Sequence, residues 1–124
     1  MGTLATLDSD GSPRTRAIWH DWSEHGLLLF SGTKTRKWQN IVNDARVSLC
    51  VDDSATPYKS VIIDGTAVRR QDQSDLLLPV VLRMAEKYYG MSEGRKFADS
   101  YSTTTEEQVA LFEIYIERVT TQGF

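Results

Sequence analysis

The sequence is poor in the residues that build disulfide frameworks and metal centres. It contains one cysteine, Cys50, and two histidines, His20 and His25. A single cysteine inside an apolar run excludes a disulfide framework and a multi-cysteine metal site, and it predicts a buried thiol. No third ligand stands at a recognisable spacing from the two histidines, so we expect no metal site.

Long hydrophobic runs are also missing. The longest run, residues 76 to 82, is interrupted by Pro79 and is far too short to span a bilayer. Residues 1 to 5 lack the charged and apolar regions of a signal peptide. We therefore expect a cytoplasmic protein that does not associate with membranes.

The chain has fewer basic than acidic residues, 14 against 17, so its formal net charge is -3. General nucleic-acid binding needs a broad basic surface, so nucleic acid is not an expected partner. The basic residues are nevertheless uneven, and six of them fall in one early region: Arg14, Arg16, Lys34, Arg36, Lys37 and Arg46. That distribution suits a small anion better than a polymer.

What is present is the pattern of a small β-rich fold. At 124 residues and 40% hydrophobic content the chain predicts one domain, residues 1–124. Alternating or continuous apolar residues predict six strands, at residues 3–7, 13–22, 27–31, 46–51, 58–70 and 109–119. Helices are expected after residue 35, over 76–89 and over 92–101. The prediction is a mainly β protein with a few helices, folded as a six-stranded antiparallel barrel or strongly curved sheet.

Three residues predict local irregularities. Gly65 lies inside a predicted strand and indicates a bulge or sharp bend where the sheet closes. Pro79 is expected in the first turn of its helix, where a missing N–H costs little. Gly90 is the expected end of that helix.

A cluster of cations at a helix start stands in the middle of the first half of the chain. Lys34, Arg36 and Lys37 follow an apolar strand and precede a short helix, in which Trp38, Ile41 and Val42 are predicted to share one face. Either Thr33 or Thr35 can cap this helix. Like charges there repel one another while the helix terminus favours anions. We therefore interpret the segment as a phosphate-binding site, with something negative compensating its cations.

The order and spacing of several segments resemble a known family. These segments are residues 4–13, 28–31, 35–37, 43–49 and 61–65, with a weaker likeness over 112–119. Together they resemble the pyridoxamine 5′-phosphate oxidase-like split-barrel family of flavin and deazaflavin proteins. The resemblance implies a six-stranded split β-barrel that forms a homodimer, with a flavin-type cofactor in the groove between the subunits.

The resemblance also implies a set of cofactor-binding residues. The family's phosphate motif falls on Thr35, Arg36 and Lys37, and the hydroxyl residue that closes the preceding strand falls on Ser31. The strand that runs along the cofactor ring falls on residues 14 to 20, and a later polar position falls near Lys59 or Ser60. The full expected set is Arg14, Arg16, Ala17, Ile18, Trp19, Phe30, Ser31, Thr33, Thr35, Arg36, Lys37, Lys59 and Ser60.

The expected function is hydride transfer between a flavin-type cofactor and an unidentified small molecule. The cofactor is FMN or the deazaflavin coenzyme F-420, and the compact chain is similar to the bacterial subgroup associated with coenzyme F-420. His20 aligns with a substrate-phosphate lysine of the family, and is either a catalytic or substrate contact or a structural hydrogen-bonding group. The alternative is a non-catalytic protein that binds or stores flavin or senses redox state. Pyridoxamine-phosphate oxidase activity is disfavoured because the C-terminal substrate set is missing, and haem binding because no extra histidine lies near the C-terminus.

Overall fold

The computed structural model describes residues 1–70, 73–105 and 107–124, with only the backbone described at Gln73 and Ser74. Within these residues the chain forms seven strands: β1 (Gly2–Leu7), β2 (Pro13–Ile18), β3 (Asp21–Trp22), β4 (Gly26–Gly32), β5 (Arg46–Asp53), β6 (Lys59–Arg69) and β7 (Val109–Gln122). The three helices are α1 (Arg36–Asn43), α2 (Gln73–Tyr89) and α3 (Met91–Asp99). The predicted class, a mainly β curled sheet with a few helices, is confirmed. The strand count differs from the prediction, since there are seven strands and not six.

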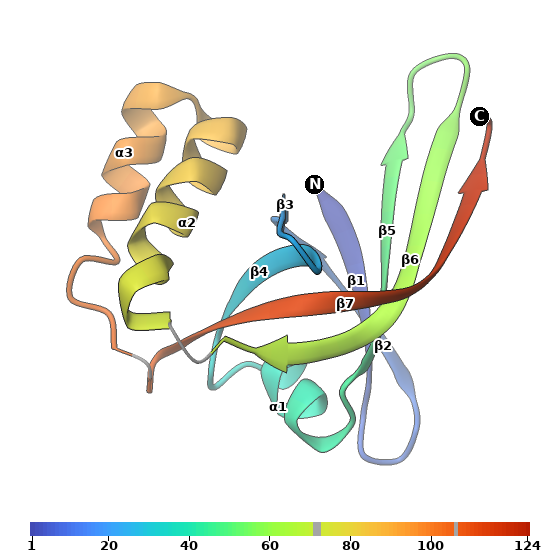
Figure 1. The fold of residues 1–124 in the computed structure, drawn as a ribbon, viewed down its shortest axis with the longest axis horizontal. Coiled ribbons are helices and arrows are strands. Elements are labelled where there is room, and N and C mark those ends of the chain that lie inside the picture. The colour runs from blue at the N-terminus through green and yellow to red at the C-terminus, as the bar shows by residue number, and fades with distance from the viewer. Residues whose placement is uncertain (71–72, 106) are drawn as a thin grey trace.

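The sheet is rolled because of how its two edges are connected. All neighbouring strands are antiparallel, and their order is β2-β1-β5-β6-β7-β4-β3. The edge strands β2 and β3 are therefore consecutive in the sequence, with Trp19 and His20 alone between them. If the sheet were flat, its edges would lie about 29 Å apart, at about 4.8 Å per strand spacing. Three Cα-to-Cα steps reach at most about 11 Å, so the sheet must curl until its edges meet, as Figure 1 shows.

The predicted single strand over residues 13–22 is therefore wrong. The chain leaves β2 at Ile18 and enters β3 at Asp21, on the opposite edge of the sheet. Trp19 and His20 are compatible with a strand, so nothing local marks the break. The break arises because distant strands fix the position of both edges.

The first half of β7 separates two cores. Ala110, Phe112 and Ile114 belong to the cluster inside the barrel, together with Leu29 and Trp38. Val109 and Leu111 belong to the second cluster, between the sheet and the α2–α3 pair. Both faces of this half strand are consequently buried, which explains its nearly continuous apolar sequence.

Helix α1 covers one end of the barrel with a different face from the predicted one. Trp38 and Ile41 are buried as expected, but Val42 is 66% exposed. The third buried residue is Asn40, whose Nδ2 donates to Thr6 Oγ1 at 3.1 Å and to Asp8 Oδ1 at 2.9 Å. These hydrogen bonds turn the helix toward Asn40 and leave Val42 in solvent.

Helices α2 and α3 lie side by side on one side of the sheet (Figure 1). Gly90 separates them with φ +86, and Gly94 brings α3 against the backbone of Ala85. α2 begins at Gln73, so Pro79 lies in its interior and not in the first turn as expected. Pro79 is exposed, and the carbonyl that it leaves unpaired can bond to water. None of the helices in the described residues is both long and apolar enough to cross a membrane.

Two glycines flank β7 where it leaves the buried core. The predicted bulge at Gly65 is confirmed, because the β6–β7 register shifts between Asp64 and Gly65. A Cβ at Gly65 would lie 2.2 Å from the carbonyl oxygen of Tyr115, and one at Gly26 would lie 2.2 Å from that of Ile114. Only glycine lets the backbones of β4, β6 and β7 approach one another this closely. The sheet bends at this point.

We expect Gly65→Ala to lower the free energy of unfolding by about 2–3 kcal/mol, because the added methyl group meets backbone that cannot move aside. Urea titration followed by circular dichroism measures this change. Gly32→Ala is the matched control, since its Cβ would meet nothing closer than 3.4 Å. Equal stability of the two variants would contradict the proposed role of Gly65.

Candidate functional site

The candidate site begins at the N-terminus of α1. Thr35 Oγ1 accepts a hydrogen bond from the Trp38 N–H at 3.2 Å, so Thr35, and not Thr33, is the N-cap. The same hydroxyl lies 2.9 Å from the Gly32 carbonyl and 3.0 Å from the hydroxyl of buried Ser31. These contacts fix the start of the helix and therefore the position of Arg36 and Lys37.

A cationic pocket of about 440 Å³ lies between β2 and this helix start. Five predicted cofactor-binding residues line it, together with three neighbours from β1 and β2: Arg14, Arg16, Thr35, Arg36 and Lys37, with Leu4, Thr6 and Thr15. The exposed edge strand β2 supplies one wall and α1 supplies the other. The structure thus brings together two basic segments that lie twenty residues apart in the sequence.

Asp8 compensates part of this positive charge. Its carboxylate accepts from Arg14 Nε at 2.7 Å and lies 3.9 Å from Arg36 Nε. Hydrogen bonds from Arg14 and then Asn40 hold the pKa of Asp8 below its usual range. Sequence reasoning expected a compensating negative group but did not identify Asp8, because its contacts with Arg14, Arg36 and Asn40 depend on the tertiary fold.

Arg16 and Lys37 remain uncompensated. Neither has an ion-pair partner within residues 1–70, 73–105 and 107–124. Burial, and then the charge of Arg16, lowers the pKa of Lys37. The opposite charge of a bound anion would offset both the desolvation cost and the repulsion. Lys34 lines a neighbouring hollow that contains Asp8 and Asp10.

An aromatic pocket of about 540 Å³ adjoins the cationic one and shares Arg16 with it. Its lining combines the end of β2 with residues from β4, the two helices and the chain start: Met1, Arg16, Ala17, Ile18, Trp19, Phe30, Tyr89 and Phe97. Phe97 was not predicted at the site, because its place depends on the packing of α3 against Ala85. The strand β2 therefore has a cationic hollow at one end and an aromatic one at the other.

His20 lies outside both pockets. It is 6% exposed, and its buried Nδ1 has no hydrogen-bond partner among the described residues. Burial, and then the charge of Lys87, lowers the pKa of His20. A catalytic or substrate contact for His20 stays a prediction.

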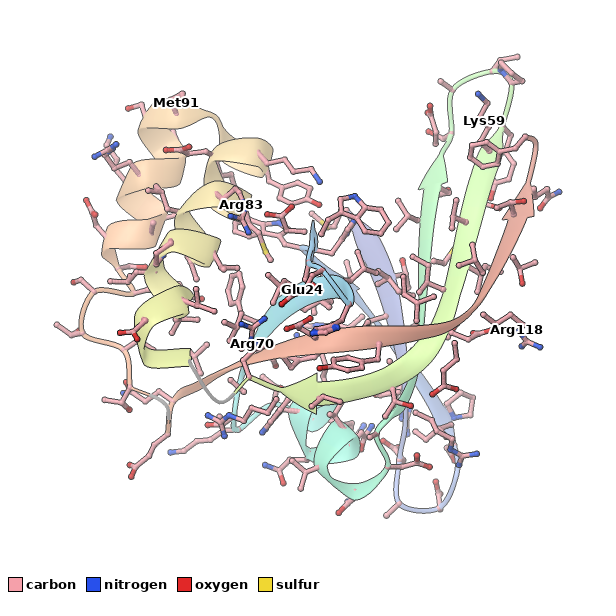
Figure 2. All side chains as sticks on the ribbon, viewed as in Figure 1. Glu24, Lys59, Arg70, Arg83, Met91 and Arg118 are labelled. Carbon is pink, nitrogen blue, oxygen red and sulfur yellow. The ribbon has the colours of Figure 1, made fainter. Side chains whose placement is uncertain are left out.

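Four further predicted residues do not line either pocket. Ser31 is buried, and its hydroxyl lies 3.0 Å from that of Thr35. Lys59 lies at the outer end of the β5–β6 hairpin, away from α2 and α3 (Figure 2), with its Nζ 5.4 Å from the centre of the Phe124 ring. Ser60 follows it and is buried. The Thr33 hydroxyl donates to the backbone carbonyl of Glu107. Cofactor binding by these residues stays a prediction.

Comparison with known families gives one match over almost the whole chain. The model of the family described as Pyridoxamine 5′-phosphate oxidase matches residues 1–123. A search of curated proteins found no match.

Solved structures share the fold. A conserved hypothetical protein from Mycobacterium tuberculosis is 26% identical with a TM-score of 0.75, over 97% of this chain and 74% of that chain. The heme storage protein HutZ from Vibrio cholerae is 21% identical with a TM-score of 0.76, over 99% and 86% of the two chains. A protein named F420 reductase is 23% identical with a TM-score of 0.72, over 96% and 87%. At such identities the last two establish a common fold alone.

We expect the stability of the protein to fall as the pH drops below about 6.5, the pKa of an unfolded histidine. The pKa of His20 is lowered in the folded state, so the unfolded chain takes up the proton first. The slope for one proton approaches about 1.4 kcal/mol per pH unit. Urea titrations at pH 7, 6 and 5 should show a smaller slope in His20→Gln than in His25→Gln, which changes an exposed histidine. The same slope in both variants would exclude His20 as the source.

Proposed function

The chain belongs to the pyridoxamine 5′-phosphate oxidase family, and from this premise we propose that it is an oxidoreductase dependent on FMN or coenzyme F-420. The observation that carries the proposal is the pair of adjoining pockets along β2, one cationic and one aromatic, with Arg16 in both. This arrangement suits a ligand with a phosphate at one end and a flat ring system at the other.

The residues of the cationic pocket fit a phosphate. Arg16 and Lys37 face it without an ion-pair partner among the described residues, and Thr35 adds a hydroxyl. Charge-assisted hydrogen bonds from guanidinium and ammonium groups to phosphate are among the strongest in proteins. We propose that Arg14, Arg16, Thr35, Arg36 and Lys37 hold the phosphate, while residues 17–19 of the strand end and Phe30 lie along the ring.

Binding, orientation and exclusion of water are the protein's proposed contributions. The bound flavin or deazaflavin would supply the hydride chemistry. Among the described residues that line the two pockets there is no carboxylate and no imidazole. We therefore assign no side chain as a proton donor. The name of the structural neighbour F420 reductase supports the deazaflavin, and that of a FAD-binding protein from Mesorhizobium loti supports a flavin.

The proposed active form is a cytoplasmic homodimer. Apolar side chains are exposed on the outer part of β7, with Ile116 37% and Val119 52% exposed. Figure 1 shows this part of the sheet projecting away from the helices. A second copy packed there would cover these residues and would bring its own Lys59 and Ser60 toward the groove.

The alternative function is a protein that binds or stores flavin, or senses redox state, without catalysis. The lack of acids and imidazoles in the described pocket linings is compatible with it. The heme storage protein HutZ, one of the structural neighbours, is an example of storage on this fold. Oxidation of the reduced cofactor with quinones or enones, beyond its spontaneous rate, would favour the enzyme.

We expect the double variant Arg36→Ala/Lys37→Ala to bind FMN and coenzyme F-420 at least about 100-fold more weakly, because two charge-assisted contacts are lost. Equilibrium dialysis and cofactor absorbance measure the affinity. The matched control is Arg46→Ala, which removes an exposed arginine that pairs with Asp44.

In the same experiment, cofactor binding by the wild-type protein tests the proposal that the protein depends on FMN or coenzyme F-420. Binding of neither cofactor in the micromolar range would overturn it. Wild-type binding with unchanged affinity in the double variant would place the phosphate elsewhere on the protein.

We expect Val119→Asp to shift the protein from dimer to monomer, because it places a charge in the proposed interface. Light scattering after size-exclusion chromatography measures the mass. Val42→Asp changes another exposed valine, on the outer side of α1, and should leave the mass unchanged. A wild-type protein that is monomeric at 50 μM, about the concentration of such a measurement, would contradict the dimer.

A further inference from the structure

Lys37 is the one lysine among the described residues that line the cationic pocket. Its side chain is half-buried, and no carboxylate pairs with it in the described parts of the chain. Burial, and then the charge of Arg16, lowers the pKa of Lys37. A larger share of its Nζ is therefore the neutral amine, which is the nucleophilic form of lysine.

Three guanidinium groups share the pocket with this amine. Arg14 and Arg16 reach it from β2, and Arg36 reaches it from α1. Asp8 pairs with Arg14 at 2.7 Å and lies 3.9 Å from Arg36 Nε, whereas Arg16 has no ion-pair partner among the described residues. Guanidinium groups bind phosphate tightly and stay protonated, so they do not act as nucleophiles. The pocket therefore combines a phosphate-binding surface with a single reactive amine.

We propose that an acyl phosphate binds in the cationic pocket and transfers its acyl group to Lys37. In an acyl phosphate, a bridging oxygen joins the phosphorus to the carbonyl carbon. A phosphate held by the arginines would therefore bring this carbonyl carbon close to the lysine amine. The pocket volume of about 440 Å³ has room for a small acyl phosphate.

The transfer is an acyl substitution that needs no oxidant or reductant. The Nζ lone pair attacks the carbonyl carbon, and an amide bond forms. The bond between the carbonyl carbon and the bridging oxygen breaks, and inorganic phosphate leaves with the electron pair of that bond. The nitrogen loses its proton to water. Arg16 and Arg36 would stabilise the negative charge that develops on the departing phosphate.

Lys34 provides a comparison within the same chain. It lies three residues before Lys37, is exposed, and lines the neighbouring hollow with Asp8 and Asp10. Hydrogen bonds hold the pKa of both carboxyl groups below its usual range, so both are ionised at neutral pH. Their charge repels a phosphate. We therefore expect acyl transfer to favour Lys37 over Lys34.

Acylation of Lys37 would also regulate the site, and this part of the inference rests on the proposed function. An amide at Lys37 removes a positive charge from the pocket, so the phosphate of the cofactor loses a charge-assisted contact. The cofactor and the acyl phosphate would compete for the same arginines. Lys37 would therefore be acylated in the cofactor-free protein and protected while FMN is bound.

Incubation of the full chain with acetyl phosphate, followed by peptide mass spectrometry, tests the acyl transfer. We expect Lys37 to be acetylated at least about tenfold faster than Lys34, because its amine is less protonated and lies beside the bound phosphate. Inorganic phosphate should slow acetylation of Lys37 and leave that of Lys34 unchanged. Equal rates at the two lysines, or a rate at Lys37 that does not respond to inorganic phosphate, would overturn the inference.

FMN binding separates the inference from the proposed function. Lys37→Gln, which resembles the acetylated side chain, should bind FMN at least about tenfold more weakly than Lys37→Arg, which keeps the charge. Lys96→Gln is the control for a lost lysine charge, since Lys96 lies on α3 and pairs with Glu93. Equal FMN affinity in all three variants would overturn the regulation. Selective acetylation of Lys37 in a protein that binds neither FMN nor coenzyme F-420 would support the acylation site and refute the regulation together with the proposed function.

Discussion

The two-residue connection between β2 and β3 is the constraint on which the structure depends. Trp19 and His20 must carry the chain from one edge of a seven-stranded sheet to the other, so the sheet closes on itself. β2 nevertheless pairs with β1 alone, and this edge strand forms the common wall of two pockets. The same connection places Trp19 under the helix pair.

Two local features of the chain place the charges of the cationic pocket. Thr35 caps α1, which begins immediately afterwards with Arg36 and Lys37. Because side chains alternate between the two faces of a strand, Arg14 and Arg16 of β2 point to the same side, where both line the cationic pocket. Asp8 offsets Arg14 at short range. What remains is an excess of positive charge beside a helix N-terminus, an arrangement that is more favourable with an anion bound than without one.

Sequence reasoning succeeded where a local rule decides the outcome. Capping rules limited the N-cap of α1 to Thr33 or Thr35, and a glycine inside a strand indicated the bulge at Gly65. It failed where distant contacts decide. The break after Ile18 depends on closure of the whole sheet, and the burial of Asn40 in place of Val42 depends on Thr6 and Asp8. The basic residues of the site were recognisable as a cluster, whereas Phe97 reaches the site only through helix packing.

The pairing of β4 with β7 joins residues that are far apart in the chain, from Gly26 with Tyr115 to Gly32 with Val109. β1 and β2 form a hairpin of neighbouring residues. Distant pairings lose more chain entropy, and folds that depend on them fold more slowly. We therefore expect the β1–β2 hairpin to pair before the barrel closes, since closure requires the C-terminal strand β7. The topology therefore bears on the order in which the strands pair as well as on their final arrangement.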